Sequence, residues 1–155
     1  MMKIRIRIFI LGLLLAFSNF LNAQSWTELQ KIVASDRGAG DQFAVSVSIS
    51  GDYAIVGAPQ ESEDASGNNF LARAGSAYIY ERDGLGVWNE VIKVVASDRA
   101  SLSLFGASVD INGTRAIVGA HDHLGVGAAY VFERDFLSGT WSEVQKLTRA
   151  FPASD

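Results

Sequence analysis

A stretch that occurs twice decides the fold, as ASDRGAGDQFAVSVSISGDYAIVGAP at Ala34–Pro59 and as ASDRASLSLFGASVDINGTRAIVGAH at Ala96–His121. Phe43 and Phe105 lie 62 positions apart, whereas Tyr78 and Tyr130, which follow them in the two copies, lie only 52 positions apart. The connection Pro59–Ala74 in the first copy is therefore ten residues longer than its counterpart. Self-similarity at this spacing predicts an array of one supersecondary unit.

Each copy contains four short segments of alternating or continuous apolar residues, which is typical of β-strands. The fourth segment begins with a tryptophan and occurs three times, as WTELQKIV, WNEVIKVV and WSEVQKLT. Asn112-Gly113 predicts a two-residue type I′ hairpin turn, in which both central residues have a positive φ. The predicted strands are Ala44–Ile49, Tyr53–Ala58, Gly75–Glu81, Trp88–Val94, Gly106–Ile111, Arg115–Ala120, Gly127–Glu133 and Trp141–Thr148.

Four short antiparallel strands make a sheet that cannot bury both of its faces alone, so neighbouring sheets must stack. Four-stranded units at this period are what β-propellers arrange radially, which predicts an all-β fold built of propeller blades. Gly57 and Gly119 each precede a small alanine and should let a neighbouring blade approach closely. Phe43 and Phe105 are predicted to fill the space between sheets.

The repeated residues resemble FG-GAP repeats, which occur in the propellers of integrin α-subunits and in many secreted bacterial proteins. The matching residues are Phe105-Gly106, Ser108, Val109, Ile117–Ala120, Gly127, Tyr130 and Phe132, and in the first copy Phe43-Ala44, Ser46, Val47, Ile55–Pro59, Gly75, Tyr78 and Tyr80. The resemblance implies a propeller fold and, by analogy with integrins, ligand contacts on one rim. It implies little about the ligand, because one fold hosts many functions.

Counted by strands, the chain holds about two and a half blades, which predicts an incomplete propeller or a fragment of a longer array. The FG-GAP region spans 24–155. Within it, residues 34–95 and 96–148 are the two blade repeats, 26–33 an unaccompanied fourth strand, and 149–155 the truncated start of a third repeat. Further blades, or association of several copies, are needed to close a ring.

Residues 1–23 have the features of a secretory signal peptide. Lys3, Arg5 and Arg7 precede the apolar stretch Ile8–Phe17, and a cleavage site follows Ala23. The rival interpretation, a membrane helix, needs roughly 20 apolar residues, so no transmembrane span is expected. The mature chain is predicted to be secreted or held at the cell surface. It contains no cysteine, so it has no disulfide framework.

The formal net charge of -4 argues against a nucleic-acid partner, because phosphate backbones are bound by basic patches. The partner expected from the predicted location is an extracellular protein or a glycan.

The repeat itself helps to separate structural from functional residues, because a polar residue at the same place in both copies is expected to serve the blade. By this criterion the ASDR stretches at Ala34 and Ala96 are structural. The ERD motifs at Glu81–Asp83 and Glu133–Asp135 are structural too, as turn residues whose side chains satisfy backbone donors.

No calcium site is expected in these two copies. Many members of the resembled family carry a DxDxDG-type loop between the first and second strands, and such a loop supplies several oxygen ligands. Here that loop is Ser48–Tyr53 in one copy and Asp110–Arg115 in the other, with one carboxylate each. No cofactor or metal is therefore predicted, and calcium would be possible only in blades outside this chain.

His121 and His123 are the two histidines of the chain. Two histidines at i and i+2 on a strand point the same way and could bind zinc, but the sequence designates no third ligand. The alternative is a pair of exposed loop histidines. Because the first copy has other residues at this place, both remain weak candidates for ligand contact.

The strongest difference between the copies is the connection Pro59–Ala74, which is ten residues longer than its counterpart and is called the insertion below. Loops alternate ends in an antiparallel sheet, so this loop should share a rim with the connections Asp36–Gln42 and Asp98–Leu104. Long loops on a rigid rim are where binding residues concentrate. A solvated loop without a function is the alternative. The candidate ligand-binding residues in it are Glu61, Glu63, Asp64, Asn68, Phe70 and Arg73.

Two functions fit these observations. The first is a secreted or cell-surface binding or adhesion module that recognises a protein or glycan through its rim loops. The second is the catalytic or non-catalytic propeller of a secreted hydrolase. An enzyme needs a nucleophile with a base, or paired carboxylates in a cleft, and no such set departs from the repeat pattern. The sequence therefore favours a non-enzymatic binder and predicts no catalytic residue.

Overall fold

The structure, a computed structural model, describes residues 26–149. The predicted signal peptide (1–23) and residues 150–155 of the predicted third repeat lie outside the described residues. The strands are β1 (Ser46–Ser50), β2 (Tyr53–Ala58), β3 (Ser76–Arg82), β4 (Trp88–Val94), β5 (Phe105–Asn112), β6 (Arg115–Ala120), β7 (Ala128–Arg134) and β8 (Trp141–Thr148). A short 3₁₀ helix, η2 (His123–Gly125), precedes β7. Among residues 26–149, no helix is long and apolar enough to cross a membrane.

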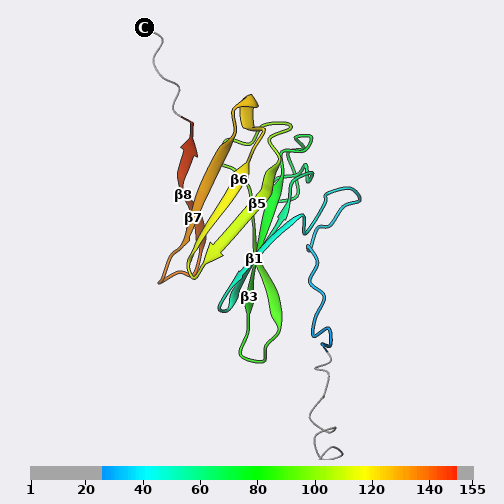
Figure 1. Ribbon diagram of the computed structural model, residues 1–155, viewed down its shortest axis with the longest axis vertical. Helices are drawn as coiled ribbons and strands as arrows, with labels where there is room; N and C mark the ends of the chain where they lie inside the picture. The colour runs from blue at the N-terminus through cyan, green and yellow to red at the C-terminus, as the bar shows by residue number, and fades with distance from the viewer. Residues whose placement is uncertain (1–25, 150–155) are drawn as a thin grey trace, which may run out of the picture. The chain divides into compact units, whose positions relative to one another are not determined.

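The strands form two four-stranded antiparallel sheets in the orders β1-β2-β3-β4 and β5-β6-β7-β8 (Figure 1). Each copy of the repeat is thus one sheet, and the two sheets are called the first and second blade below. Both have a β-bulge at the same place, after Ile79 in the first and after Val131 in the second. The predicted all-β fold of four-stranded blades is confirmed. Four of the eight strands, β2, β4, β6 and β8, begin and end where the sequence predicts.

Two predictions about the backbone are wrong. Residues 26–33 form no strand despite their fourth-strand sequence, because no described strand pairs with them. The described residues therefore hold two blades without the additional half. The turn in the second blade is centred on Gly113-Thr114, since Asn112 pairs with Arg115. Gly113 has a φ of 57° and Thr114 has no positive φ, which excludes type I′ and places glycine where a type II′ turn requires it.

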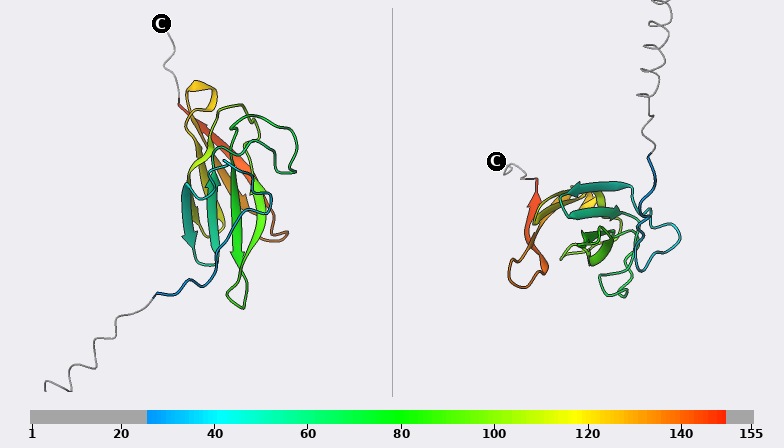
Figure 2. Two further views of the ribbon diagram at one scale, coloured as in Figure 1. Left: turned by 90° about the vertical axis from the view of Figure 1, so that its right-hand side faces the viewer. Right: turned by 90° about the horizontal axis from the view of Figure 1, so that it is seen from below.

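The two blades pack face to face, with β1 and β2 of the first against β5 of the second (Figure 2). Phe105 is fully buried in this contact, in one core with Ile55 and Ile79 of the first blade, and its ring lies 5.4 Å from that of Tyr130. The predicted role of Phe105 between the sheets is confirmed. Burying such a ring contributes roughly 2 to 3 kcal/mol.

Glycine is required where the blades touch. A Cβ atom on Gly57 would lie 1.9 Å from the backbone oxygen of Gly106 in the second blade, so the predicted close approach is confirmed there. At Gly119 the nearest neighbour is the Ser108 side chain of its own blade, 2.2 Å from a Cβ. The expected contact of Gly119 with another blade is not found among the described residues.

The other face of the first blade buries a smaller core. Phe43 packs against this core only half-buried, with its ring 5.6 Å from that of Tyr78. The buried members of the core are Ala34, Ala54, Val56, Ala58, Tyr78 and Tyr80. The described residues contain no blade on this side, so the place of Phe43 between two sheets stays a prediction.

Candidate functional site

The insertion and the connection into the first blade meet on one rim, as the alternation of loops predicts. The backbone amide of Gln60 donates to the carbonyl of Asp41 at 3.2 Å, which joins the two loops directly.

The insertion is tied by its own hydrogen bonds. The carboxylate of Asp64 accepts from the amide and hydroxyl of Ser66 at 2.9 and 2.6 Å, from the amide of Asn68 at 3.0 Å, and from the side chain of Asn69. These bonds, the one from the Ser66 hydroxyl above all, hold the pKa of Asp64 below its ordinary value. Asp64 and Asn68 therefore shape the turn.

The second blade also holds the insertion. The guanidinium of Arg99 donates to the carbonyls of Ser62 at 2.9 Å and Asn69 at 3.0 Å. Next to it, the amides of Leu104 and Phe105 donate to carbonyls at the end of the insertion, at 3.1 and 3.0 Å. The insertion is thus fixed at both ends, which makes it a usable wall for a binding site.

Glu61 is buried beneath this wall, with 4% of its surface exposed. Its carboxylate accepts from the ammonium of Lys93 at 2.9 Å, from the hydroxyl of Ser76 at 2.6 Å, and from the amide of Glu63 at 2.8 Å. A buried charge is tolerated only when it is paired and hydrogen-bonded in this way. Glu61 therefore serves the blade, and it lines the rim with a carboxylate that is already engaged.

Lys93 also links Glu61 to the connection into the first blade. Its ammonium binds the carboxylate of Asp36 at 2.7 Å, and Asp36 accepts from the hydroxyl of Tyr78 at 2.8 Å. Burial acts to raise the pKa of Asp36, but the hydrogen bonds from Lys93 and Tyr78 outweigh it and leave that pKa below the ordinary value. For Lys93, burial acts to lower the pKa, and the bonds to Asp36 and Glu61 raise it overall.

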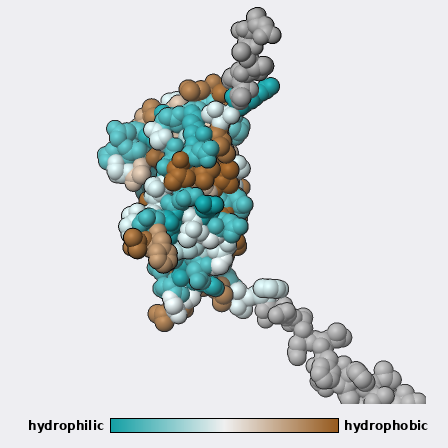
Figure 3. Space-filling model, turned by 90° about the vertical axis from the view of Figure 1, so that its left-hand side faces the viewer, coloured by the Kyte–Doolittle hydropathy of each residue, from teal (hydrophilic) through white to brown (hydrophobic). Residues whose placement is uncertain are grey.

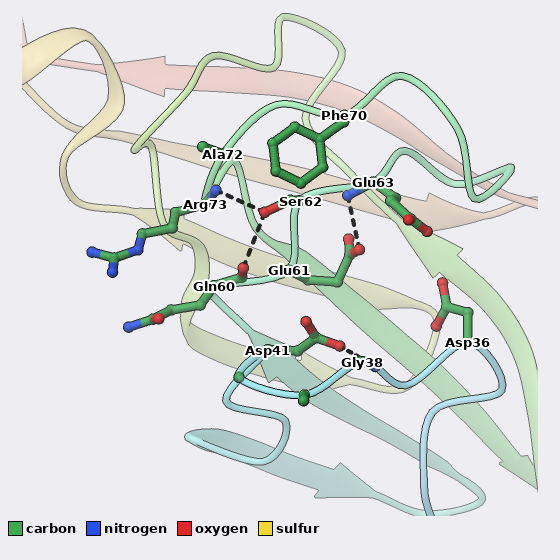
Figure 4. A pocket seen from close by; sticks show the side chains of 12 residues that line it. Asp36, Gly38, Asp41, Gln60, Glu61, Ser62, Glu63, Phe70, Ala72 and Arg73 are labelled. Carbon is green, nitrogen blue, oxygen red and sulfur yellow. Dashed lines mark hydrogen bonds between the residues drawn. The ribbon is translucent and has the colours of Figure 1, made fainter.

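An open cleft of about 420 Å³ lies between the two loops. Figure 4 shows Gly38 and Asp41 on one side of it, Glu61 and Glu63 on the other, and Phe70 above. Its lining consists of Asp36, Gly38, Ala39, Gly40, Asp41, Gln60, Glu61, Ser62, Glu63, Phe70, Ala72 and Arg73. The side chain of Arg73 points away from the centre (Figure 4).

Of the predicted contact residues, the cleft brings together Glu61, Glu63, Phe70 and Arg73, whereas Asp64 and Asn68 lie outside its lining. Sequence reasoning missed Asp36, Asp41 and Gln60. For Asp41 a signal was available, because the second copy has Ser103 at the same position, so this aspartate departs from the repeat.

In the second blade, His123 occupies the repeat position of Glu61 and is 1% exposed. Its Nδ1 lies 3.0 Å from the hydroxyl of Ser103, and its Nε2 lies 3.0 Å from Lys146 Nζ and 3.2 Å from Asp98 Oδ2. The expectation of an exposed loop histidine is wrong for His123, because the imidazole fills the place of the buried carboxylate.

His121 is exposed, and its Nε2 lies 3.7 Å from Asp122 Oδ2. It lies in a turn and His123 in η2, so the two are not paired on one strand face. Within residues 26–149, no group of three or more His, Asp and Glu side chains is arranged to hold a metal ion.

The residues repeated in both copies have structural roles, as predicted. Ser35 donates its amide and hydroxyl to the carboxylate of Glu90, and Ser97 does the same to Glu143, all at 2.7 to 2.9 Å. In the ERD motifs, Asp83 and Asp135 accept backbone amides of their own hairpin turns. Ser35, Ser97, Asp83 and Asp135 do not line the cleft, whereas Asp36, from the first ASDR stretch, does.

A protein-family model described as FG-GAP repeat matches residues 26–80 and 88–132, more than half of the chain. Each match begins at a tryptophan that opens a fourth-strand sequence and ends in the third strand of the blade that follows. The family unit therefore extends from the end of one blade into the next, whereas the repeats predicted from the sequence begin at 34 and 96. No curated protein matches the chain.

Proposed function

The chain belongs to the FG-GAP repeat family, and from this we propose that it is a binding module of the extracellular space or the cell surface. It recognises a protein or a glycan through the cleft between the Asp36–Asp41 connection and the insertion. The family supports a propeller-type module of a kind common in extracellular binding. The assignment to this cleft is our own.

The observation that carries the proposal is the coincidence of the cleft with the place where the two copies differ. The frame beneath it, formed by Asp36, Tyr78 and Lys93, recurs in the second blade as Asp98, Tyr130 and Lys146. The walls above it, the insertion and Asp41, do not recur. A rigid frame that carries a variable loop is the usual arrangement of a binding site.

The cleft favours neutral or positively charged partners. Four carboxylates line it, from Asp36, Asp41, Glu61 and Glu63, against the single guanidinium of Arg73. Lys93 neutralises part of this charge, but Asp41 and Glu63 have no cationic partner among the described residues. Carboxylates accept hydrogen bonds from sugar hydroxyls or basic side chains, and the exposed ring of Phe70 offers an apolar contact. Sulfated or sialylated glycans should be repelled.

The hydrolase alternative is less well supported. A glycosidase needs one carboxyl whose pKa is raised so that it can act as a general acid. In the cleft, the pKa of Asp36 is lowered instead, because the hydrogen bonds from Lys93 and Tyr78 outweigh the effect of burial. Glu61 is held by Lys93 and Ser76. We therefore propose a binder without catalytic residues.

The test compares two exposed phenylalanines. Phe70 lines the cleft and is 71% exposed, and Phe136, in the β7–β8 hairpin outside the cleft, is 89% exposed. The full chain is applied to an array of neutral, sialylated and sulfated glycans and of basic and acidic extracellular proteins. Phe70→Ala and Glu63→Gln are expected to weaken retention on the neutral or basic probes, and Phe136→Ala is not. Equal retention of all three variants would place the binding site elsewhere.

A further inference from the structure

The contact between the blades buries one face of each sheet. On the first blade this face, here the trailing face, carries Ile55, Ile79 and Val94, which are 0%, 0% and 4% exposed. On the second blade the opposing face, here the leading face, carries Val109 and Ile111, and Ile111 is 4% exposed. All five side chains belong to one core or pack against it.

Among residues 26–149, nothing covers the trailing face of the second blade in this way. Ile117, Val131 and Leu147 occupy the repeat positions of the three buried side chains of the first blade, as the strand ladders confirm. Ile117 is 40% exposed and Leu147 is 41% exposed. The same apolar positions are thus sealed in one blade and open to solvent in the other.

The leading face of the first blade is open along β1, whereas its side chains on β2 and β3 are buried in the smaller core described above. Val45, Val47 and Ile49 are 56%, 64% and 66% exposed, although Val47 and Ile49 correspond to the packed residues of β5. Figure 3 shows the side on which β7 and β8 of the second blade lie in Figure 1, and there apolar patches interrupt the hydrophilic surface. Exposed apolar side chains that are contiguous on a sheet face mark an interaction surface more often than scattered ones do.

A third feature of the leading side is an arginine without a partner. Arg99 clamps the loop of the preceding blade through the carbonyls of Ser62 and Asn69. Arg37 stands at the same repeat position and makes no hydrogen bond or ion pair with any described residue. If the contact between the blades recurs on this side, Arg37 corresponds to the arginine that binds the loop carbonyls of the preceding blade.

We propose that copies of this chain dock head to tail, with the trailing face of the second blade against the leading face of the first blade of the next copy. This contact repeats the one that the two blades already make within the chain. It is a heterologous contact, so it closes into a ring if the rotation per copy allows it. With two described blades from each copy, a propeller of four to eight blades corresponds to two to four copies.

One residue sets the strength of this contact. A Cβ on Gly106 would lie 2.2 Å from the carbonyl oxygen of Ser76 in the preceding blade. Ala44 occupies that repeat position, with a φ of 69° against 90° for Gly106. Its methyl group must therefore hold the preceding copy slightly apart, and the contact between copies is expected to be weaker than the contact within one.

Sedimentation of the full chain tests the proposal at micromolar concentrations, roughly 1 to 100 µM. The native chain is expected to associate as its concentration rises. Val47→Asp places a charge on the leading face of the first blade, and Ile117→Asp places one on the trailing face of the second. Each variant alone should therefore remain a monomer. An equimolar mixture should form a dimer and nothing larger, because each variant keeps one intact face. That dimer also shows that both variants are folded.

Two further variants sharpen the test. Leu85→Asp makes the same change at the β3–β4 hairpin tip, where Leu85 is 91% exposed, and should leave association intact. Ala44→Gly should strengthen association about tenfold by removing the overlap. Gln42→Gly relieves a similar positive φ, 56°, without that effect. A native chain that stays monomeric, or association that survives in Val47→Asp and Ile117→Asp alone, would overturn the proposal.

Discussion

Beneath their rims the two blades carry the same three residues and a different fourth. Asp36, Tyr78 and Lys93 in the first blade correspond to Asp98, Tyr130 and Lys146 in the second, and each aspartate accepts from its tyrosine and its lysine. The fourth residue is Glu61 in one blade and His123 in the other. The shared residues build the blade. The residues that differ lie on the rim that carries the cleft.

The largest effect on stability is expected at the contact between the two blades. Phe105→Ala should lower the free energy of unfolding by about 3 to 5 kcal/mol, because a fully buried ring is replaced by a cavity. Phe43→Ala, at the same repeat position but half-buried, should cost clearly less. Urea unfolding followed by circular dichroism gives both values. Equal costs would mean that the two rings have equivalent surroundings.

The next effect distinguishes the lysine that binds Glu61 in the first blade from the lysine that lies beside His123 in the second. Lys93→Met should destabilise by about 2 to 3 kcal/mol, because it leaves the buried carboxylate of Glu61 without its cation. Lys146→Met removes a lysine whose side chain is 28% exposed, against 6% for Lys93, and which faces an imidazole, so its cost should be smaller. The same unfolding experiment compares them. A larger loss of unfolding free energy in Lys146→Met than in Lys93→Met would show that the lysine of the second blade contributes more to stability.

A double-mutant cycle converts one network into the other. His123→Glu places a carboxylate beside Lys146, but Ala128 stands where Ser76 donates to Glu61 in the first blade. His123→Glu with Ala128→Ser should therefore be more stable than the two single changes predict, by about 1 kcal/mol. Additive single effects would show that the serine donor is unimportant to the buried carboxylate.

The smallest effect concerns pH. In both Asp36 and Asp98, burial acts to raise the pKa, and hydrogen bonds from the lysine and tyrosine outweigh it, so both values lie below 3.8. A lowered pKa stabilises the folded chain above pH 3.8, and this stabilisation is lost as the pH falls through the folded value. The urea concentration at the midpoint of unfolding should therefore decrease when the pH is lowered below about 4.

The double variant Asp36→Asn, Asp98→Asn should be less stable at neutral pH but show a flatter acid limb. Asp122→Asn, an exposed position, is the control and should follow the native chain. An unchanged acid limb in the double variant would assign the loss of stability to other carboxylates.

Much of the fold was accessible from the sequence, because strands leave a local pattern and the repeat gives each pattern twice. Residues 26–33 carry the same pattern and form no strand, since a strand also needs a partner. The buried states of Glu61 and His123 could not be predicted from their polar loops, because they depend on lysines that arrive from β4 and β8. The sequence does show Lys93 and Lys146 among the apolar residues of β4 and β8, which is a sign that a buried acceptor faces each of them.

The central claim is that binding occurs where the first blade departs from the second. Hydrogen exchange of backbone amides, with and without the strongest binder from the array, tests it most directly. New protection is expected in residues 38–41 and 60–73, with no change in the corresponding loop of the second blade, 121–127. Protection that appears instead at the opposite end, in the turns at 50–52 and 112–114, would contradict it.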